Sequence, residues 1–242
     1  MHEWSLLLFT LFVQIAAGGI TALALVQTFG SKDASLKEIG FFALIAGIGA
    51  CFSLTHLGDM FGAYRALYNP ASSWLSREAW VTGAFAGAVV LCAFLAWRGK
   101  SWSKLLMSTA ILGLVAVYAS SAVYASTVME KWRASSPCVE FFASTFLIGP
   151  FIVAFSRRTQ RRDLFLTGGL SALGLLLLIL NLGMYGGTYD SAFAAVRFLA
   201  IGIGFVTAIF TMLGPKHAAP VGVFATVCLV LGEGLGRYLF FM

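Results

Sequence analysis

The sequence predicts an all-α integral membrane protein, a bundle of eight transmembrane helices with both termini on the periplasmic side. Three observations support this fold class. The chain of 242 residues is 60% hydrophobic and 11% charged, which is more apolar than soluble domains of this length. Its apolar residues form eight runs long enough to cross a bilayer, a distance that takes about 20 helical residues. Finally, the Lys and Arg residues are divided unequally between the two ends of these runs.

The eight runs follow one another with short connections, so we expect residues 1–242 to form a single transmembrane anchor domain. The first run lacks a basic leading segment and a small-residue cleavage site, which favours a retained helix over a signal peptide. Small residues at 16–19 (AAGG) and 83–88 (GAFAGA) predict faces on which helices pack closely. The expected helices cover residues 4–29, 39–59, 78–97, 105–128, 139–155, 164–185, 193–213 and 221–241.

The predicted orientation rests on the connections between helices. Those after the first, third, fifth and seventh helices carry ten Lys and Arg residues, whereas the other side carries six. Lys and Arg accumulate in cytoplasmic loops, and the densest group here is RRTQRR at 157–162. We therefore expect that group in the cytoplasm, and both termini and the connection 53–80 on the periplasmic side.

The cysteines and histidines argue against a metal or haem site. The four cysteines lie in four separate segments without CxxC spacing, so they match neither a zinc nor an iron–sulfur pattern. The three histidines, at positions 2, 56 and 217, are spread over both predicted sides and cannot pair as haem ligands inside the bilayer. The net charge of +6 is scattered between apolar runs, which excludes a nucleic-acid-binding class. We expect no haem, no metal in this chain and no nucleic-acid partner.

The connection 53–80 holds the strongest candidates for chemistry. His56 ends the second predicted helix and Glu78 begins the third, so both side chains are expected at one membrane edge. An imidazole and a carboxylate at that depth could accept the protons that a quinol releases on oxidation. The structural alternative is that each residue stabilises a helix end, with Glu78 helped by the helix dipole after an N-cap at Ser76.

Further ionisable residues are predicted toward the same edge. Glu233 and Arg237 have i, i+4 spacing, which predicts an ion pair along one helix face. Arg197 needs an anionic or carbonyl partner if it is buried, and Asp190, Glu233 or Glu78 could provide one.

Other polar residues are assigned to binding or packing. We expect Arg65, Arg237 and Glu233 to join His56 and Glu78 in binding quinol. The aromatic connection around Arg65 is expected to be an interfacial segment or part of a docking surface. Interhelical hydrogen bonds are expected from Gln14 and Asn181.

Motifs distributed over the whole sequence carry a family resemblance. They read HEW near the first residue, HLG followed by RAL and SWLSRE, EFFASTFLIGP in the fifth helix, and GEGLGR in the last. Together they resemble the DmsC family, the membrane anchor subunits of bacterial dimethyl sulfoxide reductases, and HLG with SWLSRE is the most specific combination. The resemblance implies eight transmembrane helices with periplasmic termini, in a multi-pass protein of the bacterial cytoplasmic (inner) membrane.

The resemblance also implies a role in electron transport during anaerobic respiration. Such anchors hold a molybdopterin catalytic subunit through a four-cluster iron–sulfur subunit, oxidise menaquinol and carry no haem. They do not act on the terminal substrate themselves. The histidine of the family's HLG motif matches His56, and the glutamate of its SxE motif matches Glu78; both are implicated in quinol binding and oxidation. After HLG the chain has Asp59 and Met60 where many members have a proline, a departure that concerns the loop and its contact with the iron–sulfur partner.

Three other functions are compatible with the residues. The anchor of a sulfite-oxidising or related molybdoenzyme would run electrons in reverse and reduce quinone. A transporter would carry polar groups at the membrane midplane, whereas the ionisable groups here are predicted at one edge. A purely structural anchor would leave quinone to bind elsewhere. In the leading hypothesis, the connections 61–73 and 130–136 dock the iron–sulfur subunit, because a quinol-oxidising protein without a redox centre needs a nearby electron acceptor.

Overall fold

The computed structural model describes residues 2–31, 33–55, 63–100, 102–127, 137–158, 160–185, 191–213 and 219–241. Within these ranges the protein forms eight helices long and apolar enough to cross a membrane, and one short 3₁₀ helix. The all-α membrane fold and the helix count are therefore confirmed. The elements are α1 (His2–Phe29), α2 (Leu36–Thr55), η1 (Ala63–Leu67), α3 (Trp74–Trp97), α4 (Ser103–Ala125), α6 (Pro137–Ser156), α7 (Arg161–Tyr185), α8 (Ser191–Leu213) and α9 (Ala219–Phe241).

The start of α3 corrects a prediction. α3 begins at Trp74, four residues before the predicted start at Glu78. Its N-cap is Ser73, whose hydroxyl accepts a hydrogen bond of 3.4 Å from the Ser76 backbone N–H, so Ser76 is not the cap. Glu78 lies in the second turn, and the helix dipole acts mainly on charges in the first. The interpretation of Glu78 as a helix-end group is wrong.

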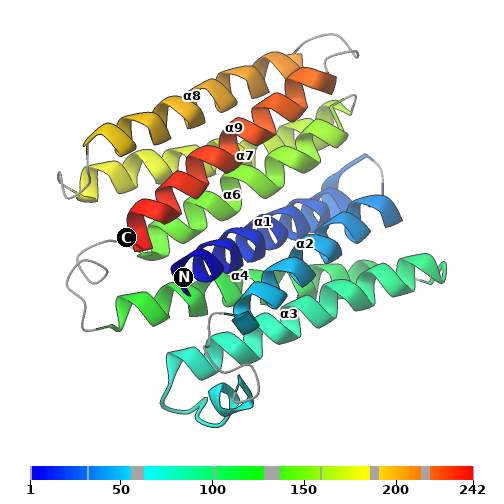
Figure 1. Ribbon diagram of the computed structural model, residues 1–242. Helices are drawn as coiled ribbons and strands as arrows, with labels where there is room; N and C mark the ends of the chain where they lie inside the picture. The colour runs from blue at the N-terminus through cyan, green and yellow to red at the C-terminus, as the bar shows by residue number, and fades with distance from the viewer. Residues whose placement is uncertain are drawn as a thin grey trace.

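Successive helices run in opposite directions, so both termini lie at one end of the bundle (Figure 1). We call the end that holds the start of α1 and the end of α9 the termini side, and the end that holds the α6–α7 connection the opposite side. α1 is the central helix and contacts α2, α4, α6 and α9. In Figure 1, α3 and α8 lie at the two extremes of the bundle.

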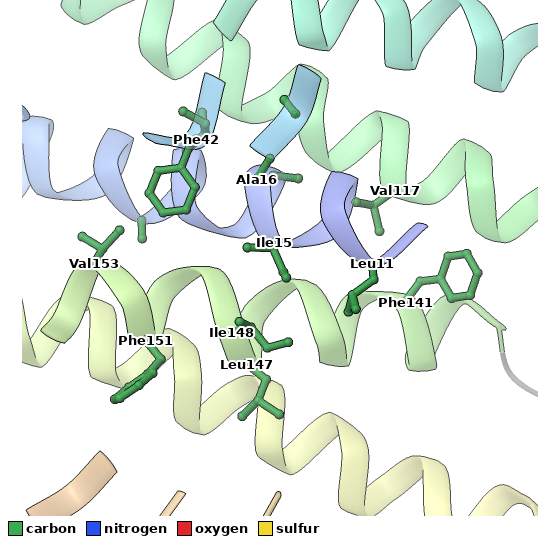
Figure 2. Packing of buried hydrophobic residues seen from close by; sticks show 14 of the residues in the cluster. Leu11, Ile15, Ala16, Phe42, Val117, Phe141, Leu147, Ile148, Phe151 and Val153 are labelled. Atoms are coloured by element: carbon green, nitrogen blue, oxygen red, sulfur yellow. The ribbon is translucent and has the colours of Figure 1, made fainter. Parts of the chain in front are cut away.

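The hydrophobic core forms where α1 packs between α6 and the helices α2 and α4. Figure 2 shows Ile15 of α1 beside Ile148 of α6, in a cluster that also includes Phe42 of α2 and Val117 of α4. An all-helical arrangement suits a membrane because each helix satisfies its own backbone hydrogen bonds in lipid.

Glycines allow α1 and α6 to approach closely. A Cβ atom added to Gly18 would lie 1.8 Å from the Thr145 carbonyl oxygen, and one added to Gly149 would lie 2.3 Å from the Gly19 backbone nitrogen. No larger residue fits at either position without moving a helix. The predicted close packing of the stretch 16–19 is therefore confirmed.

The same prediction is wrong for the stretch 83–88. A Cβ atom added to Gly83 or Gly87 would meet nothing within 4 Å. The side chain of this stretch that packs inward is Phe85, which is fully buried and occupies the space that Gly113 leaves on α4. No neighbouring helix packs against these two glycines, because α3 lies at the margin of the bundle.

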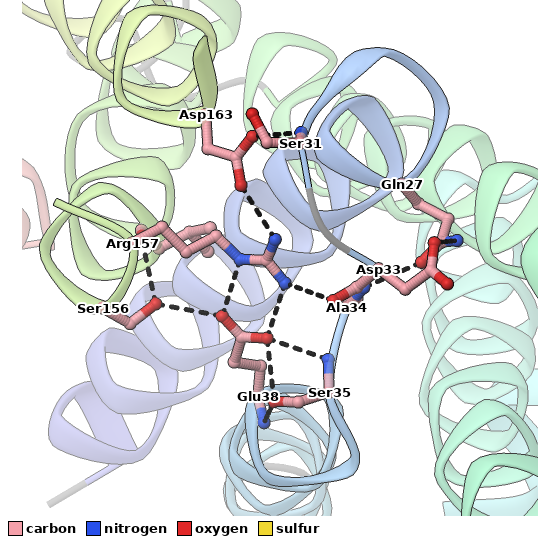
Figure 3. A network of polar contacts seen from close by, with 10 residues as sticks. Gln27, Ser31, Asp33, Ala34, Ser35, Glu38, Ser156, Arg157 and Asp163 are labelled. Atoms are coloured by element: carbon pink, nitrogen blue, oxygen red, sulfur yellow. Dashed lines mark hydrogen bonds and ion pairs between the residues drawn. The ribbon is translucent and has the colours of Figure 1, made fainter. Parts of the chain in front are cut away.

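A polar cluster around Arg157 joins four helix ends on the opposite side (Figure 3). The guanidinium donates to both oxygens of Glu38, at 2.8 Å each, and to Asp163 Oδ2 at 3.0 Å. It also donates to the Asp33 carbonyl oxygen at 2.9 Å. Burial lowers the pKa of the Arg157 guanidinium, but the bonds to Glu38 and Asp163 outweigh this and raise it above its ordinary value. Arg157 thus links the α1–α2 turn to the α6–α7 turn through hydrogen bonds and ion pairs.

Candidate functional site

A cavity of about 270 Å³ lies between α2, η1 and α3, toward the termini side. Glu78 contributes the acidic group of its wall and is only 5% exposed. The remainder of the wall is largely apolar, a lining that suits a lipid-soluble ring. The lining residues are Phe9, Ala50, Ser53, Leu54, Tyr64, Ala66, Leu67, Leu75, Glu78, Ala79, Thr82 and Gly83.

The segment from η1 to Ser73 is fastened to α3 beside this cavity. The Trp80 indole N–H donates to the Leu67 carbonyl oxygen at 3.0 Å. The Arg77 guanidinium donates to the carbonyl oxygens of Pro70 and Ala71, at 2.8 and 2.5 Å. Because these bonds start on α3, they hold the η1 residues of the cavity wall in place over Glu78.

Glu78 presents a carboxyl oxygen that the protein leaves unpaired within the described residues. Ser120 of α4 lies near the carboxyl group. Oε1 is buried and has no hydrogen-bond partner among the described residues. A buried polar atom without a partner is costly, by about 1–3 kcal/mol, so this oxygen is available to a bound molecule that enters the cavity.

Thr82, one turn along α3 from Glu78, has the same property. Its hydroxyl is buried, lines the cavity and lacks a hydrogen-bond partner within the described part of the protein. This is unusual here, since eight other helical threonines donate to the carbonyl oxygen four residues earlier, the ordinary arrangement. Those eight are Thr21, Thr28, Thr109, Thr145, Thr167, Thr207, Thr211 and Thr226.

The sequence analysis did not identify Thr82. Its i, i+4 spacing from Glu78 was the available signal, because that spacing places two side chains on one helix face. The structure thus brings together an acceptor and a hydroxyl that can donate, on two residues that line the same cavity.

The other predicted quinol-binding residues are placed differently. His56 lies outside the described residues. Arg65 is exposed on η1 with its guanidinium 5.9 Å from the Tyr64 ring centroid, next to the cavity wall but not in it. Glu233 and Arg237 are fully buried in α9 and belong to a separate cluster. The connection 130–136, predicted to dock a partner, also lies outside the described residues.

That separate cluster is built around Arg197 of α8. Arg197 Nη2 lies 2.5 Å from Glu140 Oε1 of α6 and 3.4 Å from Glu233 Oε1 of α9. The Asn181 amide of α7 also donates to Glu140. Of the candidate partners of Arg197, Glu233 is confirmed, whereas Glu140 was not considered.

Arg237 completes the cluster without the predicted ion pair to Glu233. Its Nη2 donates to Gln14 Oε1 of α1 at 2.5 Å and to Ser144 Oγ of α6 at 2.7 Å. Ser144 in turn donates to Glu233. Within the described ion pairs, Glu233 pairs with Arg197 and not with Arg237, because Ser144 of α6 bridges the two side chains by accepting from Arg237 and donating to Glu233. The predicted interhelical role of Gln14 is confirmed, as is that of Asn181.

An aromatic contact lies beside the charged cluster. Tyr124 is one turn beyond Ser120 on α4, and its ring centroid is 5.5 Å from that of Phe141. The Arg237 guanidinium lies over the Phe141 ring, 4.1 Å from its centroid. Tyr124 and Phe141 thus connect α4 with α6 beside the charged cluster.

These features define a polytopic membrane protein with ionisable groups buried between its helices, an arrangement that marks functional sites in membranes. The family model for the DMSO reductase anchor subunit (DmsC) matches residues 1–185. The protein therefore belongs to the DmsC family of membrane anchor subunits, as the motifs predicted. The match extends from α1 to the end of α7.

Individual relatives are similar to much of the sequence. The anaerobic dimethyl sulfoxide reductase subunit YnfH of Escherichia coli is 27% identical over 66% of this protein and 59% of its own length. The C subunit of the same organism's anaerobic dimethyl sulfoxide reductase is 31% identical over 62% of this protein and 56% of its own length. The matches thus span less than two thirds of these two relatives. The corresponding C subunit from Haemophilus influenzae is 24% identical over 100% of this protein and 94% of its own length.

Proposed function

We propose that this protein oxidises menaquinol in the cavity beside Glu78 and passes the electrons to an iron–sulfur subunit. The observation that carries the proposal is the pair of polar atoms Glu78 Oε1 and Thr82 Oγ1, which have no partner among the described residues and belong to two residues that line a largely apolar cavity. Apolar walls with a few convergent polar groups are typical of sites for small organic molecules.

The chemistry assigns a distinct task to each group. A quinol that becomes a quinone loses two electrons and two protons. Glu78 Oε1, which lacks a partner among the described residues, accepts one hydroxyl proton. Thr82 donates a hydrogen bond to the quinol oxygen, and His56 accepts the second proton at the membrane edge.

The electrons leave through another subunit. In this proposal an iron–sulfur subunit with four clusters docks on the termini side, which faces the periplasm, and passes electrons to a molybdopterin catalytic subunit. The location of the cavity toward that side supports this arrangement, because it shortens the distance between quinol and a docked cluster. The complex would reside in the bacterial cytoplasmic membrane. Membership of the DmsC family supports these partners.

The experiment uses the assembled complex in membranes and compares two electron donors. Glu78→Gln keeps the size and hydrogen-bonding capacity of the side chain but removes the base. We expect its rate with a menaquinol analogue as donor and dimethyl sulfoxide as acceptor to fall by about 100-fold or more, the usual contribution of a general base. Activity with reduced benzyl viologen, which donates directly to the soluble subunits, should remain unchanged.

Each possible outcome of this experiment bears on the proposal. A Glu78→Gln complex that assembles and oxidises the menaquinol analogue at the normal rate would rule out Glu78 as the proton acceptor. Loss of both activities would indicate failed assembly, and Glu78→Asp then provides the discriminating variant, because it keeps a base at a different distance. Normal viologen activity with a reduced quinol rate and an altered pH dependence supports the proposal. A quinol rate and pH dependence identical to those of the unaltered complex overturn it.

A further inference from the structure

A second and larger cavity lies on the far side of the bundle from Glu78. Its volume is about 650 Å³, and helices α6, α7, α8 and α9 form its walls. α7 packs mainly on α6, and α8 packs mainly on α9. The cavity is lined by residues of both pairs, whose four helices lie together on one side of α1 in Figure 1.

The chemistry of the wall restricts what can bind. Leu147, Phe151 and Leu229 are among the apolar residues that line it. Ser171 contributes a hydroxyl, but that group already donates to the Thr167 carbonyl oxygen at 3.3 Å. A quinone ring would need polar partners for its two oxygens. Most of the described lining residues are apolar and cannot provide such partners. A hydrocarbon tail needs no such partners.

One end of the cavity is cationic. Arg161, the first residue of α7, lines it, and its guanidinium makes no hydrogen bond or ion pair with the residues that the structure describes. Arg158 and Arg162 are close in sequence, so the opposite side carries a concentrated positive charge here. Basic pockets between transmembrane helices are typical binding sites for anionic lipid headgroups.

The length of the cavity matches one lipid leaflet. Its wall extends along α7 from Arg161 to Ala172, which are 11 positions apart, or about 16 Å along the helix axis. The hydrocarbon core of a bilayer is about 30 Å thick, so the cavity spans about half of it. Phe165 lies at its margin and is 84% exposed, which indicates that the cavity opens to the surrounding lipid.

We propose that this cavity binds one anionic phospholipid from the leaflet on the opposite side, with an acyl tail between α7 and the α8–α9 hairpin and the phosphate on Arg161. The lipid fills space that the protein leaves open between its two helix pairs. Its binding is independent of quinol, since no wall residue is shared with the Glu78 cavity.

The test is native mass spectrometry of the delipidated complex titrated with phosphatidylglycerol or with phosphatidylethanolamine of identical acyl composition. We expect one phosphatidylglycerol to bind more tightly than its zwitterionic counterpart. Arg161→Gln should weaken phosphatidylglycerol binding about fivefold, the usual contribution of one basic residue near an anionic surface, and weaken phosphatidylethanolamine binding less, because the ammonium group of that lipid offsets the charge of its phosphate. Arg98→Gln, which removes an exposed charge at the end of α3, serves as the charge-matched control.

A second variant tests the cavity itself. A Cβ atom added to Gly168 would approach no atom closer than Met212 Sδ at 3.8 Å, so Gly168→Leu places a side chain into the cavity without a clash at its base. It should abolish the tight phosphatidylglycerol site, whereas Gly40→Leu, at a position with open space outside the cavity, should not. Equal affinity for both lipids, or tight binding that survives Gly168→Leu, would overturn the proposal. So would a quinone that co-purifies with the complex and is lost in the Gly168→Leu variant.

Discussion

Arg197 of α8 and Glu140 of α6 form a fully buried ion pair of 2.5 Å between residues 57 positions apart in the sequence. Together with Glu233 and Arg237, they form a cluster of two cations and two anions. The cluster connects α8 and α9 to α6, while hydrogen bonds extend it to α1 and α7. Because its formal charge is zero, removing one member leaves an uncompensated charge in the bilayer.

We predict that the charges of this cluster are strongly coupled. Arg197→Met and Glu140→Gln should each reduce the free energy of unfolding by about 3–5 kcal/mol, the effect of breaking a buried ion pair. The double variant keeps one cation and one anion, so it should lose less than the sum of the two. The measurement is an unfolding titration in detergent, with Arg98→Met as an exposed control. Additive losses would show that the pair is not coupled.

The hydroxyl of Thr82 should contribute to binding of quinol rather than to its oxidation. Thr82→Val preserves the shape of the side chain but removes the donor. We expect KM for a menaquinol analogue to rise about fivefold, the equivalent of one hydrogen bond, with little change in kcat. Thr109→Val is the control, since Thr109 is also buried but donates to the Leu105 carbonyl oxygen. An unchanged KM for Thr82→Val would remove this residue from the site.

Close packing of α1 on α6 should tolerate no additional methyl group at Gly149. Gly149→Ala brings Cβ within 2.4 Å of two backbone atoms of α1, and overpacking costs about 1–3 kcal/mol or more. We expect a lower melting temperature in detergent and reduced assembly. Gly47→Ala adds the same methyl group at a position with nothing within 4 Å, and it should leave the melting temperature unchanged. Equal behaviour of the two variants would contradict the described packing.

At the opposite side, the stability of the protein should depend on the planar, branched guanidinium group of Arg157. Lysine keeps the charge, but its three donors sit on one nitrogen, so it cannot reproduce the four hydrogen bonds that Arg157 makes from three nitrogens. Arg157→Lys is therefore expected to destabilise the protein by about 2–3 kcal/mol, through lost hydrogen bonds to charged groups. Thermal unfolding compared with the exposed substitution Arg98→Lys provides the test. Full stability of Arg157→Lys would mean that the cation acts only as a point charge.

The uneven distribution of Lys and Arg predicts that both termini face the periplasm. Fusions of alkaline phosphatase to the C-terminus should therefore be active, whereas fusions within 157–162 should be inactive. A green fluorescent protein fusion should give the reverse pattern, because it matures in the cytoplasm. An active phosphatase fusion at 157–162 would invert the orientation and place the Glu78 cavity toward the cytoplasm.

Hydropathy predicted the helices well because a bilayer imposes one dominant requirement, an apolar run of sufficient length. Partners inside the bundle were harder to predict. Arg197 was expected to need an anion, and Glu233 was among the candidates, but Glu140 lies in the first turn of α6 and resembled an ordinary helix-end residue. Which carboxylate reaches an arginine depends on how helices distant in sequence pack, and hydropathy does not encode that packing.

The candidate site was also predictable only in part. Glu78 was identified from its position between two apolar runs, and the structure places it in a cavity wall. Thr82 was missed because a threonine in a helix ordinarily donates to its own backbone. Only the fold reveals that this hydroxyl lacks that bond.

The order of the buried charges along the sequence has a consequence for biogenesis. An arginine at the centre of a membrane helix opposes insertion by about 2.5–3.5 kcal/mol, and Arg197 lies within α8. Glu140 belongs to α6 and is synthesised before Arg197, so a carboxylate is already in the bilayer when the arginine leaves the ribosome. Glu233 follows in α9 and supplies the second anion. Arg197 therefore has one counter-ion on a helix that is synthesised earlier, α6, and a second on the helix that follows it directly, α9.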